Sequence, residues 1–580
     1  MEKIRPMLFT TLKKYSGAQL MSDVIAGIIV AIIALPLSIA LALASGVGPE
    51  QGIYTAIAAG FVISFLGGSQ VQIAGPTAAF ATIVAGIVAK SGVEGLAVAT
   101  IMAGIILVIM GFCHFGSLIK FIPFTITTGF TSGIAVTIVI GQLKDFFGVT
   151  YPAGMETIET MQKLKAFAAG FGSVNLHAII VGVVCLAILI VMPMITEKIP
   201  GSLVAVIAGI LMVKFLPLHV NTIGDLYTVS NKLPAFRLPV FSYDVIQGSL
   251  SDAFTIAVLA AIESLLSCVV ADGMIGGKHR SNTELVAQGA GNIISALFGG
   301  IPATGAIART AANVKNGGRT PVAGMVHAVV LLLILVVLMP CASWIPMPTI
   351  AAILFMVAYN MCQWRTFVRL TKTAPKSDIA VLVMTFFLTV IFDLVVAIEI
   401  GMLLSCLLFM KRMSDETGVR SWLYVEEVEE QKRKEQEVRK AKKAGKELSV
   451  EEAQLLAAAA EDEEAAMKEQ ARLREIPREL AVYEITGPLF FGAADRINQI
   501  ETREETKCLV LRMRAVPAVD STAMNSMVAL YERCQKNGVT LILSHVNEQP
   551  MHVMEKAGFD KEIGRDDRTR SFLPEYRGST

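Results

Sequence analysis

The chain has 580 residues, of which 54% are hydrophobic and only 17% are charged, whereas an ordinary soluble domain carries about 25% charged residues. Its formal net charge of +1 provides no basic surface for nucleic acid, so we expect no nucleic-acid partner. The eight cysteines include no CxxC pair, and we expect no metal and no other cofactor. A mean hydropathy of +0.60 instead indicates a chain that lies largely in a lipid bilayer.

Residues 1–22 are predicted to be a short polar N-terminus without a cleavable signal, and residues 23–413 a transmembrane transport domain. Apolar stretches of roughly twenty residues, long enough to cross a bilayer, recur through this domain. We predict fourteen spans, at residues 23–44, 52–66, 77–89, 95–113, 128–146, 176–195, 203–216, 250–272, 284–298, 304–314, 322–340, 348–364, 379–394 and 397–413.

Basic residues predict the orientation of these spans. Most lie in loops that follow even-numbered spans or come after the last span, and by the positive-inside rule such loops face the cytoplasm. We therefore expect a multi-pass protein of the inner (plasma) membrane with both termini in the cytoplasm. The basic residues concerned are Lys278, Arg280, Lys315, Arg319, Arg365, Arg369, Lys372, Lys376, Lys411 and Arg412.

Two of the predicted spans are short and begin at proline-containing breaks. Thr77 lies 54 residues after Asp23, and Thr304 likewise lies 54 residues after Leu250. This spacing predicts an inverted repeat of seven plus seven spans, in which matching broken helices hold the substrate near the middle of the bilayer. The alternative is that the prolines only kink two helices of the core.

A small anion is the substrate that such a pair of half-helices favours, because their N-termini offer unpaired N–H groups and partial positive charge. The Thr77 hydroxyl adds a donor, and small neighbouring residues allow close approach to the backbone. The predicted contacts here are Thr77, Ala78, Ala79, Gly305, Ala306 and Ile307.

Glu263 and Arg309 lie inside predicted spans, where ionisable groups are costly and usually functional. Arg309 follows the second break closely enough to face the same anion. We predict that Glu263 is the proton-coupling group, with the proton as the coupling ion. The alternative is a buried salt bridge between the two residues that only fixes packing.

The rest of the chain is predicted to lie outside the membrane. Residues 414–476 read as a charged helical connector, residues 477–560 as a small α/β domain, and residues 561–580 as a tail. Ser521 and Thr522 open a predicted helix of the α/β domain. They form either a regulatory turn, phosphorylated or facing a cytoplasmic protein partner, or a simple helix cap.

Several motifs give the chain a clear resemblance to the sulfate permease (SulP) family. They lie at residues 33–38, 73–80, 129–133, 261–266 and 284–304. The C-terminal domain resembles the STAS domain of anti-sigma-factor antagonists. The resemblance implies a core and a gate domain, a homodimer, a substrate between the third and tenth spans, and an elevator-like movement. It also implies that Ser38, within the first motif, contacts the substrate.

Among subgroups, residues 262–266, 306–314 and 487–491 look closest to bacterial proton-coupled C4-dicarboxylate transporters. Sodium-coupled bicarbonate members carry Asp where Glu263 stands and lack Arg309, which argues against sodium. We therefore predict a secondary active anion transporter rather than an enzyme. The substrate is predicted to be a C4-dicarboxylate or related anion. The alternatives are a sulfate or bicarbonate transporter and a STAS-linked membrane sensor.

Overall fold

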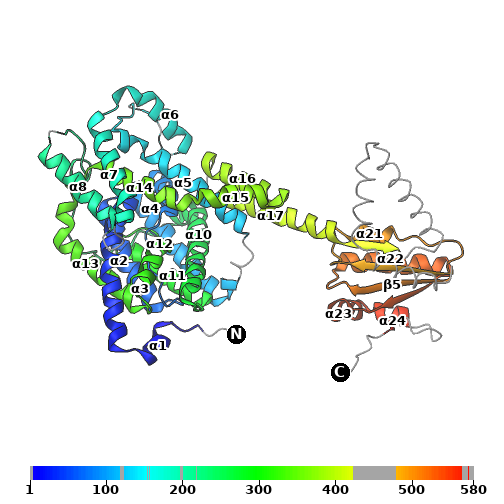
Figure 1. Ribbon diagram of the computed structural model, residues 1–580. Helices are drawn as coiled ribbons and strands as arrows, with labels where there is room; N and C mark the ends of the chain where they lie inside the picture. The colour runs from blue at the N-terminus through cyan, green and yellow to red at the C-terminus, as the bar shows by residue number, and fades with distance from the viewer. Residues whose placement is uncertain are drawn as a thin grey trace. The chain divides into compact units, whose positions relative to one another are not determined.

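The computed structural model describes residues 4–117, 123–152, 154–155, 157, 159–195, 200–216, 218–392, 394–421, 479–564 and 572–573. The chain divides into a membrane unit, Met1–Ser405, and a C-terminal unit, Cys406–Thr580 (Figure 1).

The first seven predicted spans all coincide with helices of the membrane unit. The third and fourth form a single helix, α4, that is broken at Gly92, whose φ of 69° lies outside the helical region. The helices are α2 (Gly17–Ala44), α3 (Pro49–Leu66), α4 (Ala78–Phe112), α5 (Phe124–Phe147), α7 (Leu176–Ile195) and α8 (Gly201–Phe215). Short α1 (Leu8–Thr11), α6 (Thr160–Gly170) and α9 (Ile223–Leu226) lie outside the predicted spans.

The second set of seven spans also appears as helices. They are α10 (Tyr243–Ile275), α11 (Ser281–Leu297), α12 (Ile307–Lys315), α13 (Val322–Ala342), α14 (Met347–Cys362), α16 (Lys376–Ile391) and α17 (Leu394–Glu416). An additional amphipathic helix, α15 (Trp364–Thr373), begins where Gln363 adopts a left-handed conformation with φ 44°. Within the described residues, seven helices are both long and apolar enough to cross a membrane on their own.

The membrane helices pack in two groups, as the predicted core and gate arrangement requires. In the first group α4 packs against α10 and α11, while α3 packs against α11 and α13. In the second group α5 packs against α14 and α16, and α7 packs against α8 and α14. The two broken spans, α4 and α12, both belong to the first group, because α12 packs against α10 and α2.

The C-terminal unit contains a five-stranded sheet of order β3-β4-β5-β6-β7. Strand β3 runs antiparallel to β4, and the other neighbours are parallel. The strands are β3 (Gly418–Ser421), β4 (Leu480–Thr486), β5 (Cys508–Ala515), β6 (Thr540–Ser544) and β7 (Phe572–Leu573). The helices are α21 (Ala494–Asn498), α22 (Ser521–Lys536), α23 (Glu548–Ala557) and α24 (Phe559–Gly564).

Two segments that we expected to lie outside the α/β domain contribute strands to its sheet. Strand β3 falls within the predicted connector 414–476, and β7 falls within the predicted tail 561–580. Their backbone groups pair with β4 and β6, so both segments belong to the domain. The predicted charged helix of the connector lies outside the described residues.

Candidate functional site

The two broken spans meet through a short antiparallel ladder. Strand β1 (Ala74–Gly75) pairs with β2 (Thr304–Gly305), with Ala74 opposite Gly305 and Gly75 opposite Thr304. Helix α4 begins directly after the first strand and α12 directly after the second. Their N-termini, and the partial positive charge of both, therefore converge on one point. The helices begin at Ala78 and Ile307, slightly later than the predicted spans, which start at Thr77 and Thr304, and Thr77 and Ala306 are the N-caps.

The predicted contact residues differ in their exposure. Ser38, Ala78, Ala79 and Gly305 are buried, and Thr77 and Ala306 are partly buried. Ile307 is 43% exposed.

Arg309 is the largest fully buried side chain of the site, with only 1% of its surface exposed. Its Nη2 donates to the Ser38 hydroxyl at 3.3 Å and to the Pro76 carbonyl at 3.1 Å. Its Nε and Nη1 have no hydrogen-bond partner in the described part of the chain. Because Arg309 lies in the first turn of α12, its cation adds to the positive end of the helix. A buried cation with free donors is a site that favours an anion.

Glu263 comes from α10 and lies beside the other half-helix. Its Oε2 accepts a hydrogen bond of 2.8 Å from the Thr77 hydroxyl. No salt bridge joins Glu263 to Arg309, so the alternative of a structural pair between them is not seen in this arrangement. The Thr77 hydroxyl, which we expected to face the anion, is instead engaged by Glu263.

At a glycine on each strand of the ladder, an added methyl group would force a neighbouring polar side chain to move. A Cβ on Gly75 would clash with Nη1 of Arg309, and a Cβ on Gly305 would clash with Nε2 of Gln72. The backbone thus comes close to both polar side chains, and a methyl group at Gly75 would displace the guanidinium.

Behind the ladder lies a buried polar network that sequence reasoning missed. Glu284 on α11 is fully buried. Its oxygens accept five hydrogen bonds of 2.8–3.2 Å from the N–H groups of Gly68 and Ser69, the amides of Gln72 and Gln288, and the Ser264 hydroxyl. Polar residues at helical spacing within an apolar span, here Glu284, Gln288, Asn292 and Ser295, were the available signal.

Asn292 and His327 extend the set of missed polar residues. The side-chain amide of Asn292 accepts a hydrogen bond of 2.8 Å from the Ala303 N–H and donates one of 2.9 Å to the Ala303 carbonyl. These two bonds fix the chain just before β2. His327 on α13 is 1% exposed, and neither ring nitrogen has a partner within the described ranges.

Ser521 and Thr522 are both exposed at the start of α22. The preceding Asp520 caps this helix by accepting from Ala523 N–H at 2.8 Å. Its other oxygen accepts from Phe491 N–H at 2.9 Å. The turn is therefore a true helix cap, and it is joined to the loop after β4.

Comparisons with known proteins agree with this architecture. Residues 20–385 match the sulfate permease family, and residues 470–572 match the STAS domain. YvdB of Bacillus subtilis (strain 168), described as a proposed sulfate transporter, is 36% identical over 95% of this chain and 96% of its own.

Two solved structures share the fold. The transmembrane domain of a cyanobacterial bicarbonate transporter, BicA, is 28% identical, covers 70% of this chain and 100% of its own, and superimposes with a TM-score of 0.61. The murine anion transporter Slc26a9, in an inward-facing state, is 17% identical over 96% of this chain and 91% of its own, with a TM-score of 0.80. The likeness to Slc26a9 is consistent with fourteen spans followed by a STAS domain.

Proposed function

We propose that this chain, which belongs to the sulfate permease family, is a secondary transporter that carries a small inorganic oxyanion together with protons. The chain is a membrane anion transporter with a C-terminal STAS domain, and not an enzyme. The observation that carries the finer proposal is Arg309, a buried cation at the meeting point of two helix N-termini with two donor nitrogens unpartnered within the described residues.

The substrate that we favour is sulfate. Two helix N-termini and one guanidinium supply enough positive charge for a dianion in a site of low dielectric. YvdB is described as a sulfate transporter and BicA as a bicarbonate transporter, and the expected likeness to C4-dicarboxylate transporters finds no support in these comparisons. Bicarbonate is the second candidate, on the likeness to the BicA transmembrane domain.

Proton coupling is proposed for Glu263, which lies within hydrogen-bond distance of Thr77 at the same helix N-terminus. We propose that the first group of helices, which contains α4 and α12, is the core, and that it carries the anion past the second group, the gate, in an elevator-like step. We further propose a homodimer in the inner membrane with both termini in the cytoplasm.

The STAS domain is proposed to regulate transport. A phosphate on Ser521 or Thr522 would lie at the positive N-terminus of α22, where an anion is stabilised. The same exposed turn is where a cytoplasmic protein partner would bind.

Counterflow in proteoliposomes tests the proposal. Vesicles preloaded with unlabelled sulfate, bicarbonate or succinate are each diluted into the same anion in labelled form, and accumulation of label is followed. We expect sulfate to support counterflow and succinate to fail. Counterflow with succinate alone would contradict the substrate assignment. The variant Arg309→Gln removes only the cation, and it should abolish counterflow with every substrate.

A further inference from the structure

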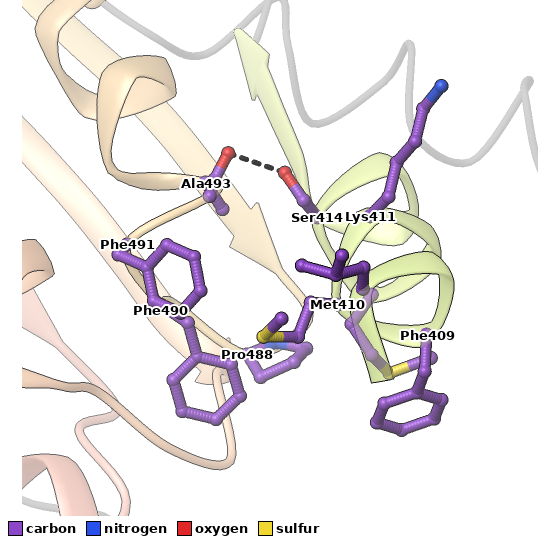
Figure 2. Close-up of a pocket in the computed structure, with 11 residues that line it drawn as sticks. Phe409, Met410, Lys411, Ser414, Pro488, Phe490, Phe491 and Ala493 are labelled. Carbon is purple, nitrogen blue, oxygen red and sulfur yellow. Dashed lines mark hydrogen bonds between the residues drawn. The ribbon is translucent and has the colours of Figure 1, made fainter. Parts of the chain in front are cut away.

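An apolar pocket of about 400 Å³ lies between the end of α17 and the loop that follows β4 (Figure 2). Both walls belong to the C-terminal unit. One wall carries Leu407, Phe409, Met410 and Met413 of α17, and the other carries Pro488, Phe490 and Phe491. Its volume lies within the range of about 300–1,000 Å³ that is typical of pockets for small organic ligands.

The loop is held in place by polar contacts that leave its aromatic rings free. The Ser414 hydroxyl donates to the Gly492 carbonyl, and the Thr417 hydroxyl donates to the Pro488 carbonyl at 2.9 Å. From the other side, Asp520 accepts the Phe491 N–H. Because these contacts use backbone groups of the loop, the rings of Phe490 and Phe491 are left to line the pocket. Figure 2 shows them across the pocket from Met410.

Exposed apolar side chains are concentrated at this loop. Within residues 479–564, Phe490 at 39% and Phe491 at 58% are the exposed large hydrophobic residues of the domain. On α17 the exposed residues Leu403, Leu407 and Met410 follow one another at helical spacing and end at the pocket. The apolar surface of the last predicted span is thus continuous with the pocket.

A charge accompanies this surface. Lys411 lines the pocket with its stem, while its ammonium group points away from the aromatic rings (Figure 2). A lysine at the end of a membrane span places its stem along apolar groups and its ammonium among lipid phosphates. We propose that the pocket binds an acyl chain of an anionic phospholipid, with the lipid phosphate near Lys411, and so anchors the STAS domain to the membrane surface.

Photolabelling of the full-length protein tests this site. The protein is reconstituted in vesicles of phosphatidylethanolamine and phosphatidylglycerol that contain a trace of phospholipid with a diazirine on its acyl chain. Labelled peptides are then identified by mass spectrometry. We expect adducts within residues 406–414 and 488–493, and at least about a five-fold loss of these adducts in Phe490→Ser/Phe491→Ser, because apolar contact area is removed. The matched variant Phe490→Leu/Phe491→Leu should keep them.

The charge is tested separately by exchanging phosphatidylglycerol for phosphatidylcholine in both the bulk lipid and the photoreactive lipid. Labelling of the wild type should fall in this exchange, and labelling of Lys411→Gln should be low in both lipids, whereas Lys411→Arg should behave as the wild type. Equal labelling of the serine and wild-type proteins would overturn the proposal. So would a photoreactive residue at position 491 that crosslinks to a second copy of the chain and not to lipid.

Discussion

The Thr77 hydroxyl donates a hydrogen bond of 2.8 Å to the Glu263 carboxylate, although the two residues lie 186 positions apart in the chain. The contact joins the N-cap of the first half-helix to the first long helix of the second repeat. It also places a carboxylate beside the positive end of α4, where an arriving anion would compete for the same charge.

Thr77→Val should weaken anion binding about ten-fold, because a hydrogen bond to a charged group is worth roughly 1.5–3 kcal/mol. When Glu263 takes up a proton, its carboxyl group becomes neutral and accepts the hydrogen bond from Thr77 less strongly. The Thr77 hydroxyl can then turn toward the anion. Equilibrium binding of labelled sulfate to purified protein measures the effect, with Thr77→Ser as the control that keeps the donor. If the valine variant binds sulfate with the affinity of the wild type, Thr77 does not contact the anion.

Gly75→Ala should impair transport through Arg309 without disturbing α4. The new Cβ would clash with Nη1 of Arg309, so the guanidinium must move. A displacement of about 1 Å in a positioned group can cost as much as a hundred-fold in rate. Initial uptake rates measure the loss. Gly86→Ala is the matched control, because a Cβ there meets no atom within 4 Å, and a similar loss in both variants would count against the explanation.

Glu284→Gln should destabilise the membrane unit, whereas Glu263→Gln should leave its stability nearly unchanged. Glu284 is fully buried, and the new amide nitrogen would face donors that previously had an acceptor. Each buried donor left unpaired costs about 1–3 kcal/mol. Thermal unfolding in detergent compares the two variants. Equal midpoints would show that the Glu284 network is not structural.

Buried thiols of the STAS domain should react slowly with maleimide. Burial raises the pKa of the Cys534 thiol above its ordinary value, so less of the reactive thiolate is present at neutral pH. A variant that retains Cys534 alone should label more slowly when folded than when unfolded in urea, and the rate of the folded protein should rise as the pH is raised. Fast labelling of Cys534 at neutral pH would mean that α22 does not pack as described.

Much of the fold follows from the sequence because the bilayer restricts what apolar stretches can do. Every predicted span corresponds to a helix, and the break between the third and fourth falls at Gly92, where α4 is kinked. The symmetric positions of Thr77 and Thr304 indicate two matching breaks, and the structure joins these breaks through the pairing of Ala74 with Gly305, which was not predicted.

The parts that could not be predicted depend on contacts between distant segments. The strand Gly418–Ser421 reads as part of a charged connector, and it becomes a strand only because β4 offers a free edge. Thr77 reads as a donor for the anion, yet its partner is Glu263, which only the packing of α10 against α4 brings near. In the sequence, Glu284 is simply a charged residue at the start of a span. Its burial is explained only by the five hydrogen bonds that its carboxylate accepts from several segments of the chain.

Glu263→Gln tests the coupling mechanism. In the described structure the Glu263 carboxylate lies at the N-terminus of the first half-helix, and the Arg309 cation lies in the first turn of the second. An arriving anion brings a second negative charge into the same small site, where like charges disfavour each other. Glu263 should therefore take up a proton as the anion binds, and by linkage each ligand raises the affinity for the other by the same factor.

The glutamine variant mimics the protonated state, because its amide is neutral and similar in shape. It should bind sulfate with little dependence on pH and lose accumulation driven by an inward proton gradient, while exchange of internal for external sulfate continues. Uptake into proteoliposomes with and without the gradient, at fixed sodium concentration, makes the measurement, and Glu263→Asp is the control that keeps a titrating group. The proton assignment is wrong if uptake by the wild type does not respond to the proton gradient but does respond to a sodium gradient. The Glu263 carboxylate would then act as a ligand of Na⁺, because binding Na⁺ requires a carboxylate that stays ionised, whereas carrying a proton requires one that is neutralised.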